Sequence, residues 1–333
     1  MCGIIGYLDK RGRREHPVGR VMLSMLQALS CRGPDSAGLA VFGPSQAGWL
    51  VQVKLSKVAF TSYPRLGSPL ESLAREHIQV QRIVDALGGE EDSHDDPGPV
   101  RVLNHKAVGA YLRLQIEGDV EPAALEQLIE SDIPGTEVVS FGHQLEIVKQ
   151  VGSPAQLEAA YQISHMAGTH GIGHTRLSTE SRVDLSHSQP FWAHGVPDLA
   201  TVHNGHITNY HKLRRQYEQR GYRFYTENDS EIIGVYLRDR LAAGLSIPDA
   251  LRSSMDDFDG SFSYLAAWSG GLAYVKDRFG FKPLMVAETD DFVAIATEEV
   301  ALRQALGRGF VAKEPAPGTM QVWSVPIPQS VSA

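Results

Sequence analysis

The sequence predicts an α+β fold in which antiparallel sheets are covered by helices. The first residues, 2–8, are expected to form a strand at once, which ties down an end of the chain that is usually loose. Four short strands are expected at 261–268, 272–276, 284–287 and 292–296, separated by turn residues. Helices are expected between them, at 210–220, 229–243 and 248–256. Strands grouped at both ends around a helical middle favour antiparallel sheets with helices on their faces.

The elements near the start of the chain follow from local signals. Pro17 opens a helix whose apolar residues recur every three or four positions, as a helix with one buried face requires. A turn-rich segment at 31–38 then leads into a strand at 39–42. Further along, Asn228 or Asp229 is expected to cap the helix at 229–243, and Ser246 the next one.

The middle of the chain has a different texture and predicts a small inserted α+β unit. The segment 88–99 is acidic and contains Gly and Pro, so we expect a flexible loop there. A strand at 108–116, a helix at 122–129 and one or two strands at 136–148 are expected after it. We therefore divide the chain into 1–70, an inserted segment 71–156, and 157–333.

The composition excludes several classes of protein. The net charge of −8 disfavours a nucleic-acid partner, and no apolar run approaches the ~20 residues of a membrane helix. Two cysteines, Cys2 and Cys31, make neither a disulfide framework nor a zinc pattern. No P-loop or Gly-rich dinucleotide motif is present. We expect a cytoplasmic protein with no metal, no cofactor on this chain and no membrane partner.

Cys2 is the first candidate catalytic residue. Once Met1 is removed, this residue carries both a thiol and a free α-amine. The reference pKa of an α-amine is about 7.7–8.0, so part of it is neutral near pH 7 and can take the thiol proton. Gly3 allows the close backbone approach that such a terminus needs.

Three further motifs fit the chemistry of an amide-bearing amino acid. Arg176, followed by hydroxyl residues, suits a carboxylate, because the guanidinium fork matches it in two parallel hydrogen bonds. The side chain of Asn204 and the N–H of Gly205 can converge on one oxyanion. Asp229 can bind an ammonium group.

Each motif taken alone also has a structural interpretation. Cys2 fits a small core residue, Arg176 a structural ion pair, Asn204-Gly205 a hairpin turn, and Asp229 a helix start. Together the motifs meet the needs of hydrolysing a free amino acid's side-chain amide. His203 and His206 receive no catalytic role, and His174 and Cys31 are expected to be packed structural residues.

In this order, the motifs resemble the class-II glutamine amidotransferases, which are N-terminal-nucleophile hydrolases. The resemblance covers about 1–70 and 157–310. The residues that carry it are Met1-Cys2-Gly3-Ile4-Ile5-Gly6, Arg32-Gly33-Pro34-Asp35-Ser36-Ala37-Gly38, Gly173-His174-Thr175-Arg176, Gln189-Pro190-Phe191, His203-Asn204-Gly205, Asn228-Asp229-Ser230-Glu231, Leu265 after Asp259-Gly260-Ser261-Phe262, and Asp277-Arg278-Phe279-Gly280-Phe281-Lys282-Pro283-Leu284.

The resemblance implies a four-layer αββα sandwich and a role for each matched residue. Cys2 would be the nucleophile and its amine the base, with Asn204 and Gly205 forming the oxyanion hole. Arg176 would hold the α-carboxylate of glutamine with help from Thr179, and Asp229 its α-ammonium. Arg32 would support the terminal strand. The family's sugar-forming members have Trp and His where this chain has Leu177 and Glu180, so closure over glutamine is expected to differ.

The resemblance also implies a partner. The short chain with an insertion before Arg176 is most similar to the amidotransferase subunit of glutamate-synthase-like complexes, such as N-methylglutamate synthase. L-glutamine would be hydrolysed here, and a separate synthase subunit, with flavin or iron–sulfur centres, would accept the ammonia. Two alternatives remain: a stand-alone amidohydrolase of the same superfamily, and a non-catalytic glutamine-binding subunit.

Overall fold

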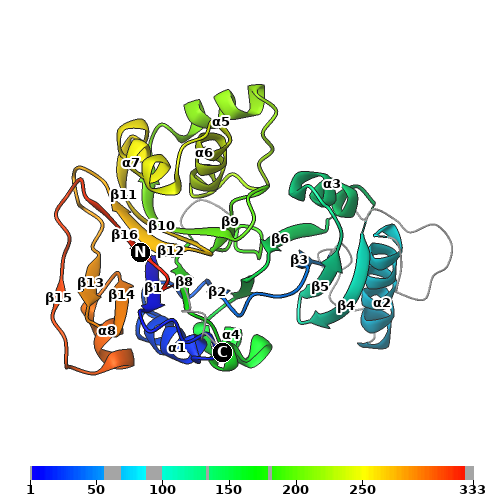
Figure 1. Cartoon of the computed structure of the whole chain (residues 1–333), viewed down its shortest axis with the longest axis horizontal. Helices are drawn as coiled ribbons and strands as arrows, with labels where there is room; N and C mark the ends of the chain where they lie inside the picture. The colour runs from blue at the N-terminus through cyan, green and yellow to red at the C-terminus, as the bar shows by residue number, and fades with distance from the viewer. Residues whose placement is uncertain (1, 56–68, 88–99, 133–134, 179–181, 327–333) are drawn as a thin grey trace, which may run out of the picture. The chain divides into compact units, whose positions relative to one another are not determined.

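The computed structural model describes residues 2–55, 69–87, 100–132, 135–178 and 182–326. Contacts between Cα atoms divide the chain into two units, each of which is described by itself. The main unit comprises 1–44, 144–193 and 198–333. The smaller unit comprises 45–143 and 194–197. Figure 1 labels most of the helices and strands of both.

The first sheet of the main unit has seven strands, and all the pairs between them are antiparallel. The strand that follows Cys2 lies in its interior, with a hydrogen-bonded neighbour on each side. A residue placed just before this strand therefore has a fixed position. In spatial order the strands are β15 (Ala312–Lys313), β13 (Met285–Glu288), β14 (Phe292–Ala296), β1 (Gly3–Asp9), β8 (His170–Arg176), β2 (Ser36–Phe42) and β7 (Leu145–Val151).

The second sheet of the main unit has five antiparallel strands. Its central strands contact β1 and β8 of the first sheet. Buried apolar side chains such as Ile4, Val202 and Leu265 belong to these strands. In spatial order the strands are β16 (Met320–Ser324), β12 (Gly271–Lys276), β11 (Gly260–Trp268), β10 (Leu199–Ile207) and β9 (Phe191–Trp192).

One group of helices contacts the seven-stranded sheet. Helix α1 (Val18–Ala28) contacts β1, β8 and β2, and buries Met22 and Leu26 against them, as its apolar spacing predicts. Helix α4 (Pro154–Tyr161) contacts β7 and β2, and α8 (Glu299–Leu306) contacts β14 and α1. A short 3-10 helix, η1 (Ile163–His165), also lies against α1.

The other helices contact the five-stranded sheet. Helix α6 (Glu231–Ala242) contacts β9 and β10, α7 (Ile247–Asp257) contacts β12 and β16, and α5 (Tyr210–Gln219) contacts α6. Ser246 caps α7 as predicted, because its side chain accepts the N–H of Asp249. The predicted cap of α6 is wrong. Ser230 occupies that position, and Asn228 accepts the N–H of Ser230 instead.

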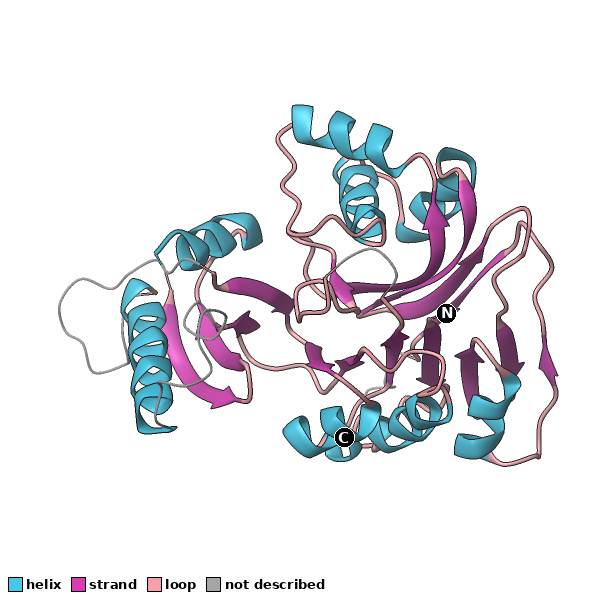
Figure 2. Cartoon of the chain, turned by 180° about the vertical axis from the view of Figure 1, so that it is seen from behind, coloured by secondary structure: helices cyan, strands magenta, loops and turns pink. Residues whose placement is uncertain are grey.

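The smaller unit is also α+β. Its sheet has the order β4 (Arg101–Val108), β5 (Tyr111–Glu117), β3 (Trp49–Lys54) and β6 (Glu137–Gly142). Helices α2 (Pro69–Ala86) and α3 (Pro122–Asp132) contact each other, and α3 contacts β6 (Figure 2). The unit begins with β3 because that strand pairs with β5 and β6, whereas β7 pairs with β2 of the main unit.

Three sequence predictions concern the inserted region. The strand expected at 108–116 is present as β5, but it begins at Tyr111, because a turn at Gly109, where φ is 60°, separates β4 from β5. Of the one or two strands expected at 136–148, two are present: β6 in the smaller unit and β7 in the main unit. The loop predicted at 88–99 lies outside the described residues.

No helix in the described ranges is both long enough and apolar enough to cross a membrane.

Candidate functional site

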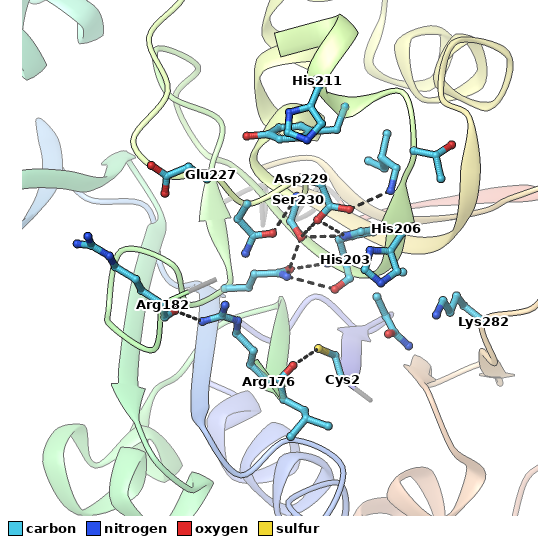
Figure 3. A pocket seen from close by; sticks show the side chains of 18 residues that line it. Cys2, Arg176, Arg182, His203, His206, His211, Glu227, Asp229, Ser230 and Lys282 are labelled. Atoms are coloured by element: carbon cyan, nitrogen blue, oxygen red, sulfur yellow. Dashed lines mark hydrogen bonds and ion pairs between the residues drawn. The ribbon is translucent and has the colours of Figure 1, made fainter. Parts of the chain in front are cut away.

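A cavity of about 960 Å³ in the main unit brings together most of the candidate residues (Figure 3). Its lining comes from the residue before β1, the end of β8, the end of β10, the segment before α6 and the loop after β12. Cys2, Arg176, Asn204, Gly205 and Asp229 all contribute to it, although they are spread over more than two hundred positions of sequence.

The backbone carbonyl of Cys2 is hydrogen-bonded by a neighbouring arginine, and the residue is only partly exposed. Arg32 donates from Nε to the backbone carbonyl of Cys2 at 3.2 Å and also pairs with Glu298. The thiol lies 3.8 Å from the carbonyl oxygen of Leu177, to which it donates. Burial raises the pKa of the Cys2 thiol, although the positive charge of Arg176 acts in the opposite direction. The thiol is therefore protonated near neutral pH, and a reaction through it requires a base.

Arg176 ends β8 and is buried apart from a small part of its surface. Its guanidinium donates to the carbonyl of Arg182 at 2.7 Å and to the hydroxyl of Ser178 at 3.3 Å. Burial also lowers the pKa of this group. These contacts hold the guanidinium at the wall of the cavity, where it can bind a carboxylate. Thr179, expected to assist Arg176, lies outside the described residues.

The segment 33–35 explains why Arg176 is fixed. A Cβ on Gly33 would lie 2.4 Å from the backbone nitrogen of Arg176, so only glycine fits there. The N–H of Asp35 donates to the carbonyl of Arg176 at 3.0 Å. The carboxylate of Asp35 accepts the N–H of Ser178 at 2.7 Å. Through these contacts the turn-rich segment fixes the position of the end of β8.

Asn204 and Gly205 lie side by side on β10. Asn204 is buried and lines the cavity, and its side-chain amide has no hydrogen bond within the described residues. Gly205 has φ 147°, and a Cβ there would lie 2.3 Å from the carbonyl oxygen of Ser261. Because Asn204 lines the cavity and its amide is not used by the described residues, it is placed to donate to a ligand oxygen.

Asp229 is positioned by two kinds of contact. Its Oδ2 accepts the N–H of Ile207 at 2.9 Å, and its Oδ1 lies 3.5 Å from the hydroxyl of Ser230. Ser230 in turn lies 2.8 Å from Nδ1 of His203, whose pKa burial lowers. Gln189 donates to the Ser230 hydroxyl at 3.0 Å and accepts the N–H of His203 at 2.6 Å. Together these buried side chains fix the carboxylate that faces the cavity.

A second histidine braces the segment that carries Asp229. Nδ1 of His187 lies 2.8 Å from Asp184 and Nε2 lies 3.3 Å from Glu227. The hydrogen bond to Asp184 is the main cause that raises the pKa of His187. The side chain of Asn228 donates to the carbonyl of His187 at 3.3 Å. His187 therefore joins the loop before β9 to the segment before α6.

Several lining residues were given no role from the sequence. Gln189 and Ser230 form the network behind Asp229, and Arg182 and Lys282 add positive charge. The motifs around Gln189 and Lys282 signalled their presence, but not their neighbours. His174 is buried, as expected. Cys31, expected to be packed, is exposed, because it lies in the turn that follows α1. Within the described residues, no group of His, Cys, Asp and Glu could hold a metal ion.

Comparison with known proteins adds a family to this geometry. A family model described as a glutamine amidotransferase domain matches residues 174–304. A candidate glutamine amidotransferase of Methanothermobacter thermautotrophicus is 36% identical over 98% of this chain and 100% of its own length. The glutamine amidotransferase-like protein GlxB of Rhizobium meliloti is 32% identical over 97% of this chain and 98% of its own length.

A solved structure shares the fold. The glutamine phosphoribosylpyrophosphate amidotransferase from B. subtilis matches with a TM-score of 0.58 and 17% identity. The match covers 96% of this chain but only 47% of that one, so this chain spans about half its length. At that identity the likeness supports the α+β fold alone. The family rests on the full-length relatives, and the chain belongs to the class-II glutamine amidotransferases.

Proposed function

We propose that this chain is the glutaminase subunit of a multi-subunit amidotransferase, with the four-layer αββα sandwich of N-terminal-nucleophile hydrolases. It hydrolyses L-glutamine to glutamate and ammonia through a thioester on Cys2. One observation carries the proposal: a thiol, a guanidinium, a donor amide beside a glycine N–H, and a carboxylate line one cavity. A free α-amino acid with a side-chain amide has one group for each of them.

The substrate is held at its α-carbon. Arg176, assisted by Thr179, binds the α-carboxylate, and Asp229 binds the α-ammonium. This pairing is chemically selective, because a guanidinium fork and a carboxylate recognise opposite charges. With both ends of the α-carbon fixed, the side-chain amide extends toward Cys2. Holding reacting atoms in place contributes much of the rate of such reactions.

The chemistry needs a base because the thiol is protonated. Removal of Met1 exposes the α-amine of Cys2, which takes the thiol proton as the sulfur attacks the amide carbon. The resulting oxyanion is stabilised by the Asn204 amide and the Gly205 N–H. The amine returns the proton to the departing nitrogen, so ammonia leaves and a thioester remains. Water then hydrolyses the thioester, releasing glutamate and restoring the thiol.

Ammonia is then used elsewhere. We propose that a separate synthase subunit of a glutamate-synthase-like or N-methylglutamate-synthase-like complex accepts it, and that any flavin or iron–sulfur centre belongs to that subunit. The glutaminase activity resides in the main unit, 1–44, 144–193 and 198–333. The inserted segment, expected at 71–156, serves assembly with the synthase through the smaller unit. Deleting 45–143, which spares β7 and α4 of the main unit, should leave basal glutaminase activity but abolish glutamine-dependent product formation. Normal coupling in the deletion variant would reject the assembly role.

The proposal is tested by replacing the proposed nucleophile. Cys2→Ala should abolish glutamine hydrolysis while the protein stays folded, and Cys31→Ala, which removes the exposed cysteine, should change little. The intact mass of active protein should show that Met1 is absent. Near-full glutaminase activity in Cys2→Ala would overturn the proposal. A wild-type protein that binds glutamine without hydrolysing it would favour a glutamine-binding subunit, and cleavage of γ-glutamyl amides without a partner a stand-alone amidohydrolase.

A further inference from the structure

The loop between β12 and β13 is fastened at its start by one buried carboxylate. Asp277 accepts the N–H of Phe279 at 2.7 Å and that of Gly280 at 3.1 Å through Oδ1. Its Oδ2 accepts the N–H of Phe262 on β11 at 2.9 Å. A carboxylate that accepts three backbone N–H groups holds the loop as a fixed turn against that strand.

The same loop is fastened again at Lys282. The hydroxyl of Ser263 donates to the backbone carbonyl of Lys282 at 3.1 Å. Phe262 and Ser263 lie directly opposite Gly205 and Asn204 in the pairing of β10 with β11. The loop is therefore anchored to the two strand positions that face the proposed oxyanion donors. The position of the Lys282 backbone relative to Asn204 and Gly205 is set by this register.

The side chain of Lys282 lines the cavity that contains Cys2, as Figure 3 shows. Its ammonium makes no ion pair or hydrogen bond within the described residues. By contrast, Lys276 at the end of β12 pairs with Glu314 at 2.7 Å. The positive charge of Lys282 also acts to lower the pKa of the Cys2 thiol, against the effect of burial. An uncompensated cation thus faces a nucleophile that must become negative.

We infer that Lys282 supplies the positive charge that stabilises the Cys2 thiolate and the oxyanion formed beside Asn204 and Gly205. The inference rests on the proposed glutaminase function and assigns a residue to it. When the α-amine takes the thiol proton, negative charge develops on sulfur and then on the amide oxygen. A cation nearby lowers the energy of both charged states more than that of the neutral amide of glutamine.

The experiment measures the reactivity of the thiol itself. The alkylation rate of Cys2 by iodoacetamide is followed against pH by mass spectrometry of the N-terminal peptide, in a Cys31→Ser background. Wild type is compared with Lys282→Met, Lys282→Gln and Lys282→Arg. Lys212→Met serves as the matched control, because Lys212 is exposed on α5 and does not line the cavity. Thermal unfolding of each variant establishes that it is folded.

Loss of the Lys282 charge should slow alkylation of Cys2 at pH 7 by about three- to tenfold, since the thiolate is the reactive species. The midpoint of the curve of alkylation rate against pH should move to higher pH. Lys282→Arg and Lys212→Met should resemble wild type. In the proteins that keep a positive charge at position 282, added salt should slow alkylation and so reduce the difference from the neutral variants. The kcat for glutamine should fall in Lys282→Met with little change in KM.

Identical alkylation profiles in wild type, Lys282→Met and Lys282→Gln would overturn the inference. If only one of the two neutral variants folds, that variant gives the comparison. Folding is expected because the side chain of Lys282 is half-buried and the hydrogen bond to its backbone carbonyl is retained. Failure of the proposed function has a different signature: Cys2 would be alkylated with the expected dependence on Lys282, yet wild type would hydrolyse no glutamine.

Discussion

The backbone N–H of Ile207 donates to Oδ2 of Asp229 at 2.9 Å, which ties the end of β10 to the segment before α6. One oxygen of the Asp229 carboxylate is thus hydrogen-bonded to the backbone, and the side chain still lines the cavity. Because the bond comes from the backbone, it also orients the carboxylate independently of any ligand. A substitution that keeps this acceptor but removes the charge therefore separates the two roles.

Asp229→Asn should raise the KM for glutamine about a hundredfold and change kcat far less. The amide oxygen still accepts the N–H of Ile207, but the charge that binds the α-ammonium is lost, and a buried or half-buried charge pair is worth about 2–3 kcal/mol. Steady-state kinetics with glutamine and with its deamino analogue check this. Wild type should strongly prefer glutamine, and the variant should lose most of that preference. An unchanged preference would remove Asp229 from ammonium binding.

Gly205→Ala should destabilise the protein by about 3 kcal/mol or more and abolish glutamine hydrolysis. Its φ of 147° is unfavourable for an L side chain, and the new Cβ would meet backbone atoms of Ser261 and Phe262. Gly244 is the matched control. Its φ is 88°, but a Cβ there meets nothing within 4 Å. Gly244→Ala should therefore cost only about 1 kcal/mol. Equal costs in urea unfolding would show that β10 shifts to accept the methyl group.

His187 predicts a pH dependence of stability. Its pKa in the folded protein is raised above the ordinary value, chiefly by the hydrogen bond to Asp184. The stabilisation is therefore fully present below the unfolded pKa of about 6.5 and is lost as the pH rises through the folded pKa. His187→Gln should lower Tm by about 1–2 °C at pH 5.5 and by less at pH 9, because both carboxylates are solvent-exposed.

The control for this prediction is His77→Gln, which replaces an exposed histidine on α2. Melting curves of the three proteins from pH 5 to 9 provide the comparison. A gap between wild type and His187→Gln that widens toward high pH would contradict the sign argued here, and would mean that His187 is more easily deprotonated in the folded protein.

Elements with strong local signals could be predicted from the sequence. The helix expected from Pro17 onward is α1, and the four late strands are β11, β12, β13 and β14. Ser246 was identified as a cap because the signal lies within four residues. The strand expected at 108–116 is present but begins only at Tyr111, because Gly109 turns the chain, and α2 was not predicted at all. Its sequence does carry end signals that the prediction did not use, with Ser68-Pro69 at its start and Gly88-Gly89 after its end.

The candidate site shows the same division. Cys2, Arg176, Asn204 and Asp229 were found because each stands in a motif whose residue types suggest a chemistry. Gln189, Ser230 and Lys282 were not given roles, because nothing in the order of residues shows that Gln189 bridges His203 to Ser230, or that Ser263 anchors Lys282. Such roles arise only when strands and loops distant in sequence are brought together.

The position of β1 inside the seven-stranded sheet has a practical consequence for producing this protein. Gly3 is paired with Thr175 and Ile5 with Ala296, so the strand has no slack with which to move Cys2 aside. Any residues fused ahead of Cys2 must start at the wall of the cavity. An affinity tag at that end is therefore expected to act as a covalently attached inhibitor. A recombinant version should carry a leader whose cleavage leaves cysteine as the first residue.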